Sequence, residues 1–140
     1  MIDPFTIRVY GIYITKDQKL LVSREKIDNK WYTKFPGGGL EYGEGPTECL
    51  KREFLEEMDQ NITIEAHFYT TDFFVQSSFN PKKQVLAIYY LIAGIEGIPQ
   101  PQNPEEQSLS FISSQATHKT LFPFETDQRV FDLILKNTPK

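Results

Sequence analysis

Residues 38–60 read GGLEYGEGPTECLKREFLEEMDQ, which predicts a glycine-rich turn followed by a helix that begins at Pro46. An α-helix turns about 100° per residue, so Glu56 and Glu57 lie about 60° and about 40° to either side of Glu53. Three carboxylates therefore share one helix face within an arc of about 100°. The interpretation of the whole chain depends on why they are there.

This acidic face has two explanations. Pairs of like charges three or four residues apart cost about 0.2–0.5 kcal/mol each, which favours a cation among them. Ligands that offer only oxygen atoms prefer a hard ion, Mg²⁺ or Mn²⁺. The alternative is a solvated helix surface, which is what most charge runs are. The three carboxylates alone do not decide between the two.

The flanking residues favour a rigidly held site. Residues 36–39, Pro-Gly-Gly-Gly, can bring backbone close to a ligand or metal because Gly lacks a Cβ. Pro46 suits the first position of a helix. Leu50, Phe54 and Met58 recur every four residues and predict a buried stripe beside the acidic face. We therefore expect a well-packed helix whose acids stay accessible.

The same stretch resembles the Nudix box of the MutT-like hydrolases. That box has Gly, five residues, Glu, seven residues and then Arg-Glu-U-x-Glu-Glu-x-Gly-U, where U is a bulky aliphatic residue. The matching positions are Gly38, Glu44, Arg52, Glu53, Phe54, Glu56 and Glu57. Asp59 replaces the final Gly, and Gln60 replaces the last aliphatic residue. Asp tolerates the left-handed conformation better than most residues, so we still expect the helix to stop at Asp59.

The resemblance implies an α+β fold, a Nudix-like α/β/α sandwich with a mixed β-sheet and two main helices, in one domain over residues 1–140. It implies a Mg²⁺-dependent pyrophosphohydrolase, with Mn²⁺ as a substitute, that cleaves the diphosphate link of a nucleoside diphosphate derivative by water attack. The implied metal ligands are Glu53, Glu56 and Glu57; the catalytic residues are Glu53, Arg52, Glu57 and Glu106; the cofactor-binding residues are Gly37, Gly38, Gly39 and Glu44.

Two roles within this set stay open at the level of sequence. The group that removes the proton from water is Glu53 or a loop acid such as Glu106. The resemblance also implies that a carboxylate from this loop completes the metal site, with Glu106 preferred and Glu105 next. Arg52 fits an orienting partner for Glu53 or Glu44 better than a direct phosphate clamp. Two other functions use the same box: a nucleotide sensor that binds without cleaving, and an isomerase or another diphosphate enzyme. A purely structural protein would leave the glycines and the acids as a coincidence.

Composition limits the partners. The length of 140 residues suits one domain with a real core, and the formal net charge of −4 comes without the basic stripe that a nucleic acid polymer requires. The N-terminal MIDPFTIRVY is not a signal peptide, and no apolar run approaches a membrane span. The lone Cys49 cannot form an internal disulfide, which fits a cytoplasmic protein with a buried or half-buried thiol. The apolar N-terminal strand is compatible with a homodimer.

Hydrophobic patterning around the box predicts several strands and a terminal helix. Strands are expected at residues 5–14, 20–23, 62–75 (one long strand or a bent pair), 85–92 and 109–112, loops at 24–32, 76–83, 94–107 and 113–120, and a helix at 124–135.

The substrate beyond its diphosphate is not readable from the box. Nucleoside triphosphates, nucleotide sugars, ADP-ribose and dinucleoside polyphosphates all contain that group. Trp31 could stack on a base, although packing in the core or at its rim is the better interpretation for a large aromatic residue. His67 and the pair His118–Lys119 fit solvated surface positions better than substrate contacts.

Overall fold

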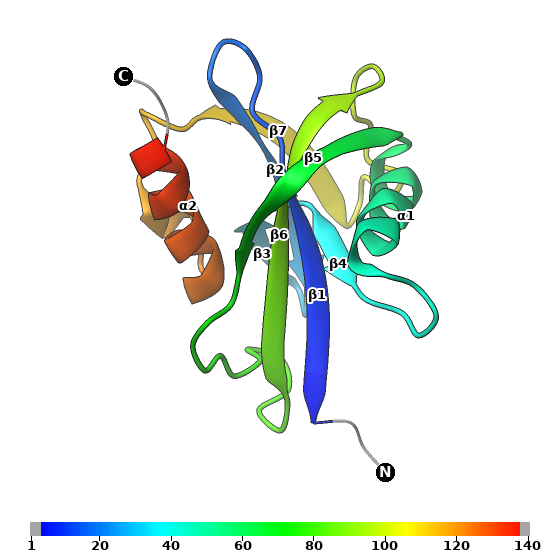
Figure 1. The fold of residues 1–140 in the computed structure, drawn as a ribbon, viewed down its shortest axis with the longest axis vertical. Helices are drawn as coiled ribbons and strands as arrows, with labels where there is room; N and C mark the ends of the chain where they lie inside the picture. The colour runs from blue at the N-terminus through cyan, green and yellow to red at the C-terminus, as the bar shows by residue number, and fades with distance from the viewer. Residues whose placement is uncertain (1–3, 138–140) are drawn as a thin grey trace.

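The computed structural model describes residues 4–137. In chain order, the elements are β1 (Phe5–Ile12), β2 (Lys19–Ile27), β3 (Lys30–Lys34), β4 (Gly37–Gly39), α1 (Pro46–Met58), β5 (Ile62–Thr70), β6 (Gln84–Ile95), β7 (Gln107–Ser113), a short 3-10 helix (Lys119–Leu121) and α2 (Glu125–Asn137). The two α-helices lie on opposite sides of the strands (Figure 1). Residues 1–3 of the N-terminal stretch considered above lie outside the described residues.

The strands form two sheets. The first has the order β4-β1-β6-β5, with β1 and β6 parallel and the other neighbours antiparallel. The second has the order β3-β2-β7 and is antiparallel throughout. This mixed arrangement between two main helices confirms the expected α/β/α sandwich of the α+β class.

Alternating residues on the strands divide the core into two parts. Val9 on β1 packs with the α1 stripe of Leu50, Phe54 and Met58, whereas its neighbour Tyr10 faces the other core. That second core holds the buried residues of α2, among them Phe131. Successive side chains of a strand point to opposite faces, so one strand serves both helices. The expected apolar stripe of α1 is confirmed.

The glycines that precede α1 form a strand rather than a simple turn. Gly37, Gly38 and Gly39 make up β4 and pair with Tyr10, Val9 and Arg8 of β1. Gly37 has a φ of +150°, and a Cβ there would lie 2.0 Å from the carbonyl oxygen of Val9. Only Gly fits this approach of two backbones, because any side chain would collide with main chain that cannot move away.

The helix α1 ends where the sequence predicts. Asp59 adopts the left-handed conformation, with φ 53° and ψ 46°, and its N–H donates to the carbonyl of Leu55 at 3.1 Å. Gln60, which stands where an aliphatic residue was expected, is buried, and its amide donates to the carbonyl of Ile98 at 3.2 Å. The polar replacement thus ties the end of the helix to the loop after β6.

Two expectations about the strands were wrong. The loop expected at 24–32 is a hairpin, because β2 continues to Ile27 and β3 begins at Lys30. Asp28 and Asn29 form its tip, both with positive φ, a conformation that these two residue types tolerate. The strand expected over 62–75 stops at Thr70, since the side chains of Asp72 and Tyr69 bond to each other at 2.6 Å beyond the strand end.

The remaining elements follow the expected pattern with shifted ends. The strand β6 covers 84–95 rather than 85–92, β7 covers 107–113 rather than 109–112, and α2 covers 125–137 rather than 124–135. Cys49 is buried, as predicted. Trp31 is 42% exposed under the guanidinium of Arg24, a place at the rim rather than in the core. No helix within residues 4–137 is long and apolar enough to cross a membrane.

Replacing Gly37 by Ala tests the close pairing of β4 with β1. We expect Gly37→Ala to lower the free energy of unfolding by about 2–4 kcal/mol, because the backbone strain and the collision add. Gly94→Ala is the matched control, since no atom lies within 4 Å of a Cβ built there. Urea denaturation measures both variants. Equal stability of the two would show that β4 does not need Gly at this position.

Candidate active site

The acidic face of α1 is organised around the guanidinium of Arg52. Its Nε and Nη2 donate to the two carboxylate oxygens of Glu44, at 3.0 and 2.7 Å. Nη2 also donates to the carbonyl of Gly39 at 3.0 Å, and Nη1 donates to Glu53 at 3.0 Å and to Glu56 at 3.1 Å. The bonds from Arg52 hold the pKa of Glu44 down at about 2. One cation therefore links the glycine strand, the loop before the helix and the helix itself.

Glu53 is packed into the angle between α1 and β4. Its side chain is 13% exposed, and a Cβ at Gly38 would lie 2.3 Å from its carboxyl carbon. The glycine of the box is thus required by the carboxylate that faces it, in addition to the pairing of β4. This places a half-buried acid directly against the backbone of the glycine strand.

The other two acids of the helix differ in exposure. Glu56 is 58% exposed and touches only the edge of the Arg52 fork. Glu57 is half-buried, and its carboxylate accepts a weak hydrogen bond from the amide of Gln107 at 3.4 Å. Burial, together with the charges of Glu25 and Glu53, raises the pKa of Glu57 to about 8 against the opposing effect of Lys34. Glu57 therefore lies in a pocket of excess negative charge.

A polar network of the second sheet reaches Glu57. Gln107 on β7 donates to the hydroxyl of Ser23 at 2.9 Å, and Ser23 donates to Glu25 at 3.1 Å. The Glu25 carboxylate lies 3.2 Å from the ammonium of Lys34. These four residues were not predicted from the sequence. The register of β2 against β3 and β7 would have identified them, but residues 24–32 were expected to be a loop.

The loop acid chosen from the sequence is exposed. The side chain of Glu106 points to solvent, and its place at the site stays a prediction. The backbone carbonyl of Glu106 accepts from the N–H of Lys26 at 2.8 Å, which fixes the chain just before β7. Glu105 is likewise exposed. The pairing of β7 with β2 turns Gln107, the next residue, inward and leaves Glu106 outside.

The carboxylates of Glu53, Glu56 and Glu57 are suitable ligands for a hard cation, although each of them is hydrogen-bonded to another side chain of the protein. Among the described residues, no three His, Cys, Asp or Glu side chains are gathered as a metal cluster. Arg52 holds Glu53 and Glu56, while Gln107 holds Glu57. Carboxylate oxygens suit Mg²⁺ or Mn²⁺, and the raised pKa of Glu57 marks negative charge that a cation would neutralise. To bind the cation, Glu53 and Glu56 would have to give up their bonds to Arg52, and Glu57 its weak bond to Gln107.

A cavity of about 620 Å³ opens between β1, β3 and the start of α2. Its charged lining consists of Arg8, Lys34, Lys83, Glu125 and Asp127, and its aromatic lining of Tyr10, Phe74, Phe79 and Phe124. Asp127 is 2% exposed, accepts from the Tyr89 hydroxyl at 2.5 Å and is also bonded by the N–H of Phe35. Burial raises the pKa of Asp127 to about 6.

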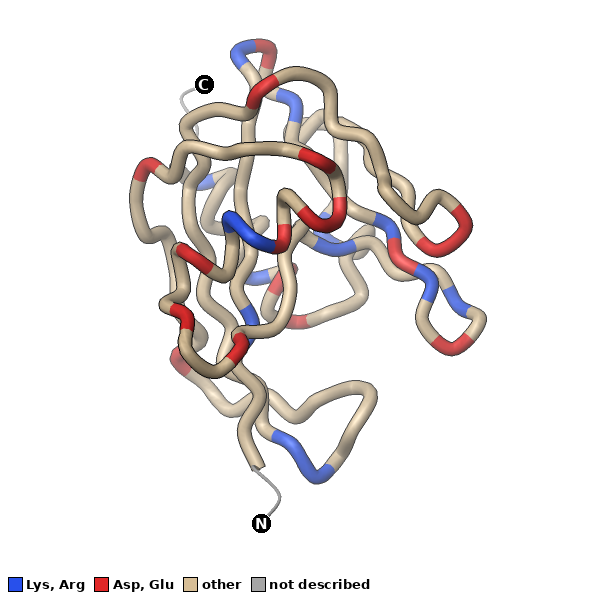
Figure 2. The backbone as a smooth tube through the Cα atoms, turned by 90° about the vertical axis from the view of Figure 1, so that its right-hand side faces the viewer, with Lys and Arg blue, Asp and Glu red and all other residues tan. Residues whose placement is uncertain are grey.

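Positive charge is scattered over the rest of the surface. Figure 2 turns the α1 side towards the viewer and shows Lys and Arg positions distributed over several elements, with no basic stripe along any one of them. His67 and His118 are exposed and bond to Thr70 and Thr120, which confirms their expected surface positions.

Comparison with known proteins agrees with this architecture. A family model described as the NUDIX domain matches residues 5–132. No curated protein matches the sequence. The chain is similar in fold to a MutT protein from Methanosarcina mazei Go1, with 17% identity, a TM-score of 0.79 and coverage of 100% of this chain and 99% of that chain.

Two further solved structures share the fold. A MutT NUDIX hydrolase from Burkholderia pseudomallei has 16% identity and a TM-score of 0.76, with coverage of 93% and 98% of the two chains. A bifunctional NMN adenylyltransferase/ADP ribose pyrophosphatase from Francisella tularensis has 18% identity and a TM-score of 0.68, with coverage of 98% of this chain and 42% of that chain.

Removing the Arg52 guanidinium tests its organising role. We expect Arg52→Met to lower the free energy of unfolding in EDTA by about 2–4 kcal/mol, because Glu44 and Glu53 lose their charged hydrogen bonds and repel each other. Arg52→Lys keeps the charge but not the fork, so its loss should be intermediate. Urea denaturation measures the effect, with the exposed neighbour variant Lys51→Met as control. A stability of Arg52→Met equal to that of Lys51→Met would contradict the role.

Buried Asp127 predicts a dependence of stability on pH. Its folded pKa of about 6 lies above the ordinary Asp pKa of 3.8, so the folded state binds more protons and stability is lost as pH rises from about 4 to above 6. Asp127→Asn removes this titration. The stability of the native protein minus that of Asp127→Asn should fall by up to about 3 kcal/mol from pH 4 to pH 7. Urea denaturation across this range checks it, and a constant or rising difference would contradict the assignment.

Proposed function

The chain belongs to the Nudix family, whose domain model covers residues 5–132, and from this premise we propose that it is a divalent-cation-dependent pyrophosphohydrolase acting on a nucleoside diphosphate derivative. Water attacks one phosphorus of the diphosphate link and releases two phosphate-bearing products. The observation that carries the proposal is the half-buried pair Glu53 and Glu57: Arg52 holds Glu53 against the glycine strand, and Gln107 of the second sheet bonds to Glu57.

The bound cation supplies the charge neutralisation and water activation that phosphoryl transfer needs, since the protein itself does little covalent chemistry in such reactions. Glu53, Glu56 and Glu57 would hold it, with Mg²⁺ as the expected ion and Mn²⁺ as a substitute. A carbonyl of the glycine strand, such as that of Gly37, would add an oxygen ligand.

The other roles in the reaction are assigned to residues of the protein. Arg52 fixes Glu53 and Glu44 so that the acids keep one arrangement while substrate enters. Gly38 leaves room for Glu53 beside the backbone. Glu53 is the group we assign to take the proton from water, because it is half-buried at the centre of the site, whereas Glu106 is exposed. Glu57 offers a carboxylate to the cation on the side that faces the second sheet.

The substrate class is a small nucleotide derivative with a diphosphate link. A MutT hydrolase and an ADP ribose pyrophosphatase domain share this fold, so nucleoside triphosphates and ADP-ribose are the first compounds to test, followed by nucleotide sugars and dinucleoside polyphosphates. The net charge of −4 and the scattered basic residues argue against a nucleic acid polymer.

The lone Cys49 supports a place in the cytoplasm. A homodimer stays a proposal from the apolar N-terminal strand.

One observation favours a second function, a sensor that binds a nucleotide without cleaving it. The acids of α1 are bonded to Arg52 and Gln107 rather than gathered as a metal cluster in the described part of the chain. Hydrolysis separates the two functions. We would incubate the protein with the four compound classes in Mg²⁺, Mn²⁺ or EDTA and identify the products by mass spectrometry. Metal-dependent cleavage of one class supports the hydrolase, and nucleotide binding without turnover supports the sensor.

Removing one carboxylate charge at a time tests the assignment of the acids. Glu53→Gln and Glu57→Gln should each lower kcat by two orders of magnitude or more, because each removes negative charge that holds the cation, and Glu53→Gln also removes the proton acceptor. The folded state should persist, as judged by circular dichroism. Glu65→Gln, an exposed position on β5, is the control. Unchanged kcat in both site variants would remove this acid site from the mechanism.

A further inference from the structure

The cavity beside the acid site has a cationic floor. It is lined by Arg8 of β1 and Lys34 of β3. Arg8 pairs with Gly39, next to the Gly38 backbone that Glu53 packs against. Lys34 is connected to Glu57 through Glu25, Ser23 and Gln107. The two cations thus lie at the boundary between the acid site and a cavity of about 620 Å³. A volume of this size suits a small organic ligand.

Arg8 is a half-buried cation that lacks an ion pair. Its Nε donates to the phenol oxygen of Tyr10 at 2.7 Å, which is a neutral partner. It pairs across the strands with Gly39, and a Cβ there would lie 3.6 Å from Nη1, so the guanidinium runs alongside the glycine strand. Within residues 4–137 no carboxylate lies in ion-pair distance of Arg8. A partly desolvated guanidinium without a counter-charge is costly unless a ligand provides one.

Lys34 reinforces the same position. It is 4% exposed, its ammonium lies 3.2 Å from Glu25, and it lies 5.2 Å from the ring centroid of Tyr10. Arg8 lies 5.7 Å from the same ring centroid. Tyr10 therefore holds two cations close together, and Glu25 can neutralise only one of them. Asp127 also lines the cavity and interacts electrostatically with both cations, but within residues 4–137 the Arg8 guanidinium forms no ion pair.

The other end of the cavity is aromatic. Phe79 and Phe124 line it, with their rings 5.9 Å apart and inclined at 66°. Tyr32 stacks on Phe124 at 5.6 Å and meets Phe79 edge-on at 5.5 Å. Aromatic walls above a cationic floor match a flat base joined to a phosphate.

We propose that Arg8 and Lys34 bind the phosphate that stays on the nucleoside when the diphosphate link is cleaved, with the nucleoside in the cavity between them and the Phe79–Phe124 wall. This assignment rests on the proposed function and adds its ligand geometry: a nucleoside monophosphate unit occupies the cavity, and the leaving phosphate group extends over the acids of α1. The arginine fork supplies the paired donors that a phosphate accepts.

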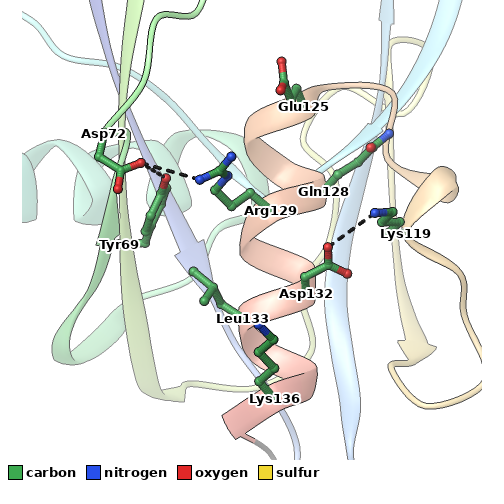
Figure 3. A pocket seen from close by; sticks show the side chains of 9 residues that line it. All are labelled: Tyr69, Asp72, Lys119, Glu125, Gln128, Arg129, Asp132, Leu133 and Lys136. Atoms are coloured by element: carbon green, nitrogen blue, oxygen red, sulfur yellow. Dashed lines mark hydrogen bonds and ion pairs between the residues drawn. The ribbon is translucent and has the colours of Figure 1, made fainter.

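The second hollow of the surface shows no comparable charge. It lies along the outer side of α2 (Figure 3), where Arg129 faces Asp72 at 3.8 Å and Lys119 faces Asp132 at 3.5 Å. Both cations already have carboxylate partners and are about half exposed. An anion would have to displace a protein carboxylate there, whereas at Arg8 it would fill an empty position.

Binding in EDTA tests the proposal without the metal or the reaction. We would titrate the intact protein by calorimetry with AMP, GMP, CMP and UMP and with the matched nucleosides. At least one monophosphate should bind at least tenfold more tightly than its nucleoside. Arg8→Met should weaken that monophosphate at least tenfold and leave the nucleoside within about twofold, and Arg8→Lys should weaken it less. Arg24→Met, an exposed arginine outside the cavity, is the control.

Lys34→Met alone leaves the half-buried Glu25 without its cation, so the double variant Lys34→Met/Glu25→Gln is used as well. It should also lose at least tenfold in monophosphate affinity while keeping that of the nucleoside. Two results would overturn the proposal: monophosphates that bind no better than nucleosides, or Arg8→Met and the double variant that both bind the monophosphate like the native protein.

The outcome is separable from that of the proposed function. Metal-dependent hydrolysis with unchanged binding in these variants would reject the phosphate-binding pair and keep the hydrolase. Phosphate discrimination that depends on Arg8 in EDTA, in a protein without turnover, would keep the pair and reject the hydrolase.

Discussion

The contact between the Arg52 guanidinium and the surrounding carboxylates is the interaction on which the rest of the structure depends. Four acids lie within ion-pair distance of this one cation, and they come from the loop before α1 and from the helix itself. Without a positive charge, the same acids would repel one another on adjoining turns. The bond from Arg52 to the carbonyl of Gly39 extends this constraint to β4, so the helix and the glycine strand keep a fixed separation.

The two hydrophobic cores hold different parts of the site in place. The core beneath α1 holds the acidic helix, and the core beneath α2 holds the walls of the cavity. Tyr10 and Lys34 lie where these halves meet, and the chain of bonds through Glu25, Ser23 and Gln107 carries that contact to Glu57. A ligand that spans both halves would therefore meet negative charge at one end and positive charge at the other, an arrangement that orients a phosphate-bearing molecule.

The sequence was most informative where periodicity and local chemistry agree. The stripe of Leu50, Phe54 and Met58 set the packing of α1, and the tolerance of Asp for the left-handed conformation marked its end. The hairpin tip at Asp28 and Asn29 was missed because the polar residues around it mask two short strands.

Side chains that reach the site through the pairing of strands could not be identified from local sequence patterns. Gln107 and Lys34 reach the site only because particular residues of β2, β3 and β7 are opposite one another. Glu106 was selected from the sequence because it is an acid. Gln107, the next residue, points in the opposite direction, because a one-residue step along a strand reverses the direction of the side chain. The candidate metal ligands themselves follow from helix geometry alone, whereas their present partners follow from the packing around them.

The most direct test of the account is whether the acids of α1 bind a divalent cation. Electron paramagnetic resonance would follow free Mn²⁺ as it is titrated with the native protein and with Glu57→Gln, at neutral pH and without nucleotide. The account predicts that the native protein binds Mn²⁺, that Mg²⁺ displaces it, and that Glu57→Gln binds it at least tenfold more weakly. Equal binding by the two proteins, or none by the native protein at millimolar concentration, would contradict a metal site on this helix.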